Sequence, residues 1–88
     1  MSEAWRDRRF SRLRRAAERL YEGDLRKQNA AKTFIAEQKR AIEAEEYPAH
    51  EDPFQRLEDG LRQQYPEVWR DCGGEVLQML REGQPGEA

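Results

Sequence analysis

The chain has 88 residues, with 16 Lys and Arg against 18 Asp and Glu, and its formal net charge is -2. This length allows one domain, and a composition with 39% charged residues leaves few large side chains for a core. No apolar run approaches the ~20 residues of a membrane-spanning helix, and no apolar segment follows the basic N-terminus, so neither a membrane protein nor a secreted one is predicted. The single cysteine, Cys72, excludes an internal disulfide and favours a cytoplasmic location.

Charge is distributed unevenly along the chain. Residues 1–40 contain twelve Lys and Arg and six Asp and Glu, whereas residues 41–88 contain four and twelve. A basic half followed by an acidic half favours association with a charged partner, either a different molecule or a second copy of the chain. Because so short a chain buries little apolar area, a partner would also add stability.

The first predicted element is a helix over residues 3–22. Its apolar residues fall within one arc of a helical wheel while several arginines gather on the opposite side, which indicates an amphipathic helix. Arg6 and Arg9 project into the apolar arc, so we expect the first two turns to leave the core. Gly23-Asp24 follows, because glycine readily ends a helix and aspartate caps the next one. The apolar residues are Trp5, Phe10, Leu13, Ala16, Ala17, Leu20 and Tyr21.

A second helix is predicted over residues 25–46. Its apolar stripe is rich in alanine, which allows close approach of another helix but buries little area. Tyr47-Pro48 ends the helix, because proline disfavours the helical conformation in the residue before it. Together the two helices are expected to form a long N-terminal helical hairpin. The stripe consists of Ala30, Ala31, Phe34, Ile35, Ala41 and Ile42.

Two or three shorter helices are predicted in the C-terminal half. Asp52 is a candidate N-cap and Pro53 suits the first helical position, so the first of these is expected over residues 53–64. Phe54, Leu57, Leu61 and Tyr65 repeat on one of its faces.

A further helix is predicted over residues 66–72, and Gly73-Gly74 is expected to weaken or break it. A last helix over residues 75–81 precedes a polar segment, 83–88, that we expect to be a flexible tail. Runs of alternating β-branched residues are missing from the sequence. The chain is therefore predicted to be all-α, a small helical bundle forming a single domain over residues 1–82.

The arginine-rich first helix is the leading candidate for a binding surface. Four of its arginines share one face, where they could contact nucleic-acid phosphates, and Trp5 could stack on an exposed base. The alternative is a solvated or protein-facing surface, with acidic neighbours at helical spacing. For Trp5 itself, two roles are possible from the sequence: packing in the core or facing a partner. This candidate surface consists of Trp5, Arg8, Arg12, Arg15 and Arg19.

A second candidate surface is acidic and surrounds the end of the second helix. Negative charge is unfavourable at a helix C-terminus, so a basic partner surface is one reason for it to be there. His50 lies among these carboxylates, but a proline-containing linker lacks the rigid spacing of a metal site, and no metal is predicted. The acidic candidates are Glu43, Glu45, Glu46 and Glu51.

The sequence offers no catalytic signature. Cys72 has no histidine near it in the chain and lies beside Asp71, so a buried structural cysteine is expected rather than a nucleophile. We therefore predict a protein without enzymatic activity and without a cofactor. It is expected to be a small adaptor, regulator or inhibitor of bacterial, phage or mobile-element origin that docks on a protein partner or on itself. The alternative is a nucleic-acid-binding regulator that uses the arginine-rich helix.

Overall fold

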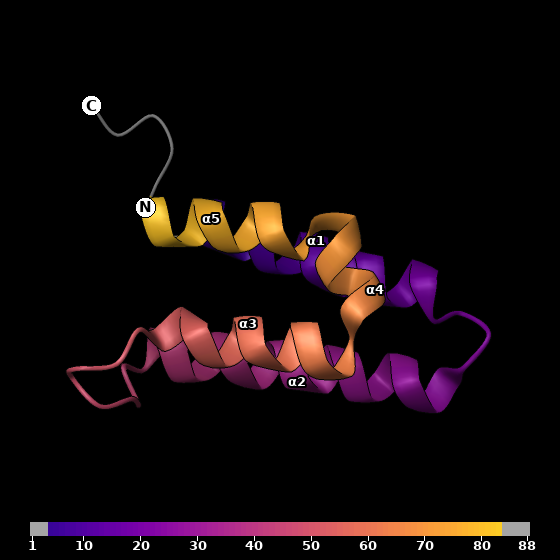
Figure 1. Cartoon of the computed structure of the whole chain (residues 1–88), viewed down its shortest axis with the longest axis horizontal. Helices are drawn as coiled ribbons and strands as arrows, with labels where there is room; N and C mark the ends of the chain where they lie inside the picture. The colour runs from indigo at the N-terminus through magenta and orange to yellow at the C-terminus, as the bar shows by residue number, and fades with distance from the viewer. Residues whose placement is uncertain (1–3, 84–88) are drawn as a thin grey trace.

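The computed structural model describes residues 4–83, and within them the protein is all-α. Residues 84–88, most of the predicted tail, lie outside this range. Figure 1 shows the hairpin of the first two helices at the rear, with the C-terminal helices packed in front of it. The helices are α1 (Ala4–Leu20), α2 (Leu25–Glu43), α3 (Pro53–Gln64), α4 (Pro66–Val68) and α5 (Gly74–Glu82), with a π-helical turn, η1 (Trp69–Gly73), between the last two.

Each long helix packs against two others. The first two helices form the predicted N-terminal hairpin, α3 lies along α2, and α5 returns along α1 and also contacts α3 (Figure 1). Successive long helices run in opposite directions, so the bundle has an up-and-down topology. None of the helices that the structure describes is long and apolar enough to cross a membrane.

Two aspartates begin helices, as the sequence predicts. The side chain of Asp24 accepts a hydrogen bond of 3.1 Å from the backbone N–H of Lys27, and that of Asp52 accepts one of 2.9 Å from Phe54. These caps satisfy N–H groups that have no partner within the helix. The third helix spans the predicted residues, 53–64.

The second helix ends earlier than expected, at Glu43 rather than at residue 46. Glu45 adopts a left-handed conformation with a φ of 56°. The next backbone N–H, of Glu46, donates to the carbonyl of Ala41 at 2.9 Å, and these are the features of a Schellman C-cap. The chain therefore turns before it reaches Tyr47-Pro48. The first helix is also shorter at its C-terminal end, where it stops at Leu20.

The core is a single cluster of apolar side chains drawn from all the helices. Among the described residues, no polar or charged residue is buried as a whole. Phe34, Phe54 and Trp69 are partly buried and pack against the cluster. The buried residues are Trp5, Phe10, Leu13, Ala16, Ala17, Tyr21, Ala31, Ile35, Ile42, Leu57, Leu61, Tyr65, Val68, Cys72, Val76, Leu77 and Leu80.

The expectation that the first two turns leave the core is wrong. Trp5 is only 9% exposed and Phe10 only 1%, so the first helix packs along its whole length. Trp5 packs in the core. These two turns are buried because, in the tertiary structure, α5 returns along α1 and covers this end of the helix.

The Gly73-Gly74 pair, which was expected to weaken or break the helix before it, does not break it. Helical structure continues from Pro66 to Glu82 through η1, where the N–H of Gly74 donates to the carbonyl of Trp69. A Cβ on Gly73 would lie 2.9 Å from Cε3 of Trp69. Glycine is therefore needed because the indole packs directly on the backbone.

Candidate functional site

The arginine face of α1 is partly neutralised within the protein. Arg12 forms an ion pair of 2.7 Å with Glu75, and Arg19 forms one of 2.7 Å with Asp71. Both acidic partners lie on the C-terminal helical segment that packs along α1. Two of the four predicted arginines therefore already have carboxylate partners.

The other two arginines of this face, Arg8 and Arg15, are exposed and form no ion pair among the described residues. Arg15 lines a shallow pocket of about 230 Å³, together with Ser11, Arg14, Glu18 and Lys32. Lys32 approaches Glu18 to 2.9 Å, and this hydrogen-bonded ammonium lowers the pKa of the Glu18 carboxyl group. The pocket is thus cationic but contains one carboxylate.

The acidic candidates differ in their surroundings. Glu51 lies 3.7 Å from Arg56, and Glu43 lies 3.9 Å from Lys39, which also contacts Asp7 at 2.9 Å. Glu45 and Glu46 are exposed. Two of the four acidic candidates, Glu43 and Glu45, line a cleft that is also lined by Trp5, a residue of the predicted arginine-rich surface.

We call this cleft the end cleft. It has a volume of about 340 Å³ and lies where the start of α1, the end of α2, the start of α3 and the end of α5 meet. Most of its lining is aromatic or aliphatic, and its charged groups come from α1 on one side and from the end of α2 on the other. The lining residues are Trp5, Arg6, Ile42, Glu43, Glu45, Tyr47, Pro53, Phe54, Leu80 and Gly83.

Two arginines near this end have unsatisfied polar atoms. The Nε atoms of Arg6 and Arg9 are buried and have no hydrogen-bond partner. Buried polar groups in folded proteins are nearly always paired, since an unpaired one costs about 1–3 kcal/mol. The guanidinium of Arg6 lies 6.0 Å from the ring centroid of Trp5, within the range of a cation–π contact. In the sequence, both arginines interrupt the apolar arc and could extend the arginine surface, but neither belongs to its five predicted residues.

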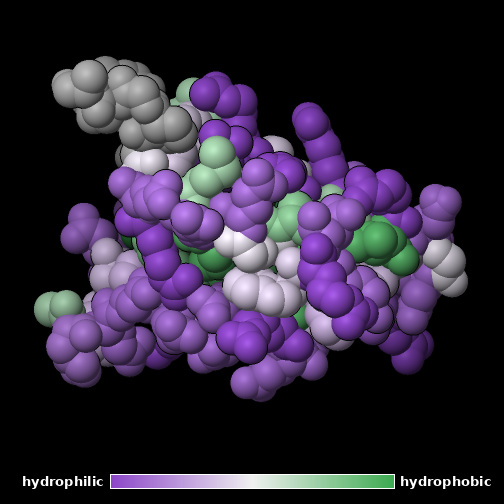
Figure 2. Space-filling model, turned by 45° about the horizontal axis from the view of Figure 1, so that its top comes forward, coloured by the Kyte–Doolittle hydropathy of each residue, from purple (hydrophilic) through white to green (hydrophobic). Residues whose placement is uncertain are grey.

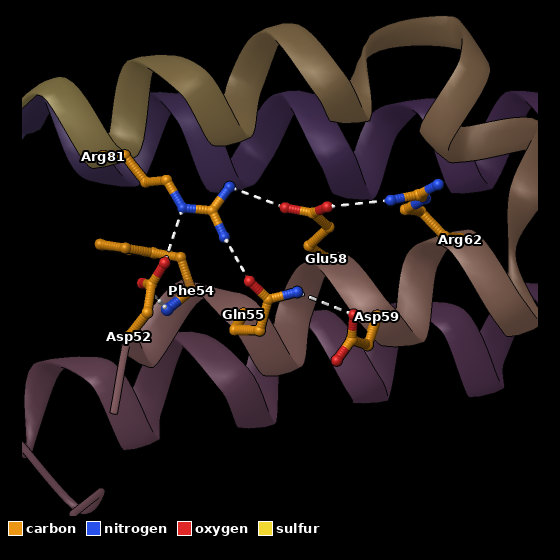
Figure 3. A network of polar contacts seen from close by, with 7 residues as sticks. All are labelled: Asp52, Phe54, Gln55, Glu58, Asp59, Arg62 and Arg81. Atoms are coloured by element: carbon orange, nitrogen blue, oxygen red, sulfur yellow. Dashed lines mark hydrogen bonds and ion pairs between the residues drawn. The ribbon is translucent and has the colours of Figure 1, made fainter. Parts of the chain in front are cut away.

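A network centred on Arg81 holds two walls of the end cleft together (Figure 3). Its guanidinium donates to Asp52 at 2.8 Å, to Glu58 at 2.7 Å and to Gln55 at 3.3 Å. Burial by itself would lower the pKa of Arg81, but the hydrogen bonds to Glu58 and Asp52 outweigh it and raise the pKa. The end of α5 is thereby fixed to the start of α3, beside Phe54 of the cleft.

The single cysteine and the single histidine of the chain both lie within the described residues. Cys72 is buried, and burial together with Asp71 raises the pKa of its thiol. His50 is exposed. Across residues 4–83, His, Cys, Asp and Glu form no group of three that could hold a metal ion.

Hydrophilic side chains cover most of the face drawn in Figure 2, and hydrophobic residues appear there only in small, separated patches. On this face, a broad apolar interface of the kind found in obligate dimers is missing. No protein-family model, curated protein or solved structure matches the chain. Its function is therefore inferred from its own side chains.

Proposed function

We propose that this chain is a non-enzymatic interaction protein that docks another protein at the end cleft. The observation that carries the proposal is the concentration there of several aromatic and aliphatic side chains, an arginine with a buried unpaired Nε, and two glutamates. Aromatic residues and arginine are the side chains that contribute most to protein–protein binding. A partner that covered the cleft would bury the remaining apolar surface of Trp5 and Phe54.

The proposal also covers the setting of the interaction. We place the protein among cytoplasmic adaptors, regulators or inhibitors of bacterial, phage or mobile-element systems. A second copy of the chain remains one candidate partner. The high content of charged residues supports a role at surfaces, because such a chain has little apolar area to spare for a large core.

The alternative, binding of nucleic acid, is supported by the pocket between Arg14, Arg15 and Lys32. Against it, the pairing of Arg12 and Arg19 with Glu75 and Asp71 interrupts the row of cations along α1. A phosphate backbone is contacted best by a continuous row of unpaired cations. The arrangement therefore favours a protein partner.

Three single charge reversals test the proposal in one experiment. Tagged protein is used to capture partners from the source cell, with and without nuclease, as wild type and as Arg6→Glu, Arg8→Glu and Arg40→Glu. Arg6 lines the cleft, Arg8 belongs to the arginine face, and Arg40 is an exposed control on α2. We expect a nuclease-resistant protein to be retained by all variants except Arg6→Glu, with circular dichroism showing that each variant is folded.

Loss of the partner on nuclease treatment, or loss with Arg8→Glu but not with Arg6→Glu, would contradict the proposal. The alternative has its own quantitative signature. Binding of duplex DNA through Arg8, Arg14 and Arg15 would neutralise three phosphates, so the logarithm of affinity would fall with the logarithm of salt concentration with a slope of about -2.7. We expect no such binding at physiological salt.

A further inference from the structure

We infer that the end cleft binds a short peptide segment of a partner protein, one that places an aromatic or large aliphatic side chain next to a carboxylate. The inference rests on the proposed function and specifies the chemistry of the occupant. Three features of the cleft carry it: its size and lining, the unpaired arginine atoms, and the position of its glutamates.

The size and lining of the cleft suit one side chain with its flanking backbone. Its volume of about 340 Å³ is at the lower end of pockets that bind small ligands, roughly 300–1,000 Å³. Trp5, Phe54 and Leu80 come from three different helices and provide apolar walls. An inserted aromatic ring would contact the exposed parts of these side chains on one side, and polar groups, which form more of the exposed cleft surface, on the other. Burial of the ring against the apolar part would supply some of the affinity.

The arginines call for an anionic group beside that anchor. Arg6 makes no hydrogen bond or ion pair within residues 4–83, and its Nε is buried without a partner. An arginine binds a carboxylate in a bidentate manner when two neighbouring N–H groups face it, and the Nε–H is one of these groups. Arg6 is partly exposed and lines the cleft, so its guanidinium is accessible to an occupant, whereas its Nε–H would need a change of rotamer to join such a contact. Arg9, three residues further along the same helix, has the same unpaired atom but does not line the cleft, so the contact is assigned to Arg6.

The glutamates exclude a simple anion. Glu43 and Glu45 line the same cleft as Arg6, near the end of α2, and Glu43 also lies 3.9 Å from Lys39. Free phosphate or a nucleic-acid backbone would be attracted by Arg6 and repelled by these carboxylates. A peptide can present a carboxylate to Arg6 and a lysine or arginine to the glutamates. The occupant is thus a protein segment of the type acidic–aromatic–basic.

Two matched tripeptides test this chemistry without knowledge of the natural partner. Acetyl-Asp-Phe-Lys-amide and acetyl-Asn-Phe-Lys-amide differ only in the carboxylate. They are titrated into the full-length ¹⁵N-labelled protein, and the signals followed are the Arg6 Nε–H and the indole N–H groups of Trp5 and Trp69. Trp69 does not line the end cleft and serves as an internal control.

We expect the Asp peptide to shift the signals of Arg6 and Trp5 but not that of Trp69, and to bind about fivefold more tightly than the Asn peptide. In Arg6→Gln this preference should vanish, while Arg14→Gln, in the other pocket, should keep it. Equal affinity of the two peptides for the wild-type protein, no binding of either, or an equal shift of Arg6 by inorganic phosphate would overturn the inference. If the captured protein still requires Arg6 in that case, the docking site stands and only the chemistry of its occupant is wrong.

Discussion

The hydroxyl group of Tyr21 donates a hydrogen bond of 2.8 Å to Glu67, and this contact joins the end of the first helix to the start of the last helical segment. Burial and the contact with Glu67 raise the pKa of Tyr21, and the donated hydrogen bond lowers the pKa of Glu67. The two residues thus support each other's ordinary charge states. The ring of Tyr21 also lies 6.2 Å from that of Tyr65, so the contact sits at the edge of the core.

We predict that Tyr21→Phe lowers the free energy of unfolding by about 1 kcal/mol at pH 7, because one hydrogen bond to a charged group is lost while the ring remains. The raised pKa of Tyr21 adds stability that is fully present below pH ~10 and is lost as the pH rises further. Urea denaturation at pH 7 and at pH 10.5 should therefore show a smaller alkaline loss in Tyr21→Phe than in the wild type.

The lowered pKa of Glu67 acts at the other end of the pH range. It adds stability above pH ~4.5 that is lost as the pH falls below this value, and Tyr21→Phe should reduce that loss as well. Tyr47→Phe is the matched control, since the Tyr47 hydroxyl makes no hydrogen bond within the described residues. An equal change of the alkaline loss in both variants would contradict the role of Tyr21.

Asp52 has two roles that can be separated by mutation. One carboxylate oxygen caps α3 through the N–H of Phe54, and the other binds Arg81. Asp24 caps α2 and forms no ion pair within residues 4–83. We predict that Asp24→Ala costs about 1 kcal/mol, as a lost N-cap does, and that Asp52→Ala costs more.

A double-mutant cycle of Asp52→Ala with Arg81→Met measures how much the contact between these two side chains contributes to stability. Because both side chains are partly exposed, we expect a coupling energy of about 0.5–1 kcal/mol, measured by urea denaturation. Methionine keeps the aliphatic part of Arg81, so loss of packing contributes little. A coupling energy of zero would mean that the network shown in Figure 3 does not stabilise the end of α5.

Gly60 is predicted to resist substitution although it lies within a helix. A Cβ at this position would overlap Cζ of Phe34, so the ring would have to move off α3. We expect Gly60→Ala to destabilise the protein by about 1–2 kcal/mol, despite the better helix propensity of alanine. Thermal or urea denaturation measures the change, and the additional substitution Phe34→Leu should recover part of it.

Gly74→Ala is the matched control. A Cβ at Gly74 would meet Trp69 at 3.7 Å, an ordinary contact, and the backbone there is helical. This variant should be more stable than the wild type by roughly 0.5–1 kcal/mol. A loss of stability in Gly74→Ala as large as that in Gly60→Ala would show that the contact with Phe34 is not the cause.

Cys72 is predicted to be unreactive in the folded protein. Its thiol is buried, its pKa is raised by burial and by Asp71, and the thiolate is the form that reacts. A thiol reagent at pH 8 should therefore modify the native protein at the rate at which it unfolds, and much more slowly than the denatured chain. Rapid, stoichiometric modification under native conditions would contradict this assignment.

Local signals in the sequence predicted the fold class correctly. Asp24, Asp52 and Pro53 act within one turn of their own positions, and apolar periodicity needs only neighbouring residues. The N-terminal hairpin follows from two such segments joined by a short turn. These features depend on interactions between residues close in the chain, which is why they could be read without the structure.

The candidate site could not be predicted in the same way. The burial of Trp5 and the pairing of Arg12 with Glu75 depend on α5 returning along α1, more than fifty residues later in the chain. The end cleft combines residues from four segments, so no local pattern describes it. One signal was present, because Arg6 and Arg9 interrupted the apolar arc at the position where the structure has unpaired atoms.

The π-helical turn at Trp69–Gly73 determines which side of α5 faces the core. Val68, Cys72, Val76 and Leu80 are buried at a constant spacing of four, although a regular α-helix returns to the same side every 3.6 residues. The wider turn, closed by the bond from Gly74 to the carbonyl of Trp69, takes up part of that difference. Removal of a single residue from this turn would rotate α5 about its own axis by about a quarter of a revolution. Asp71 or Glu75 would then no longer form its ion pair with α1, and Leu80 would rotate away from the end cleft.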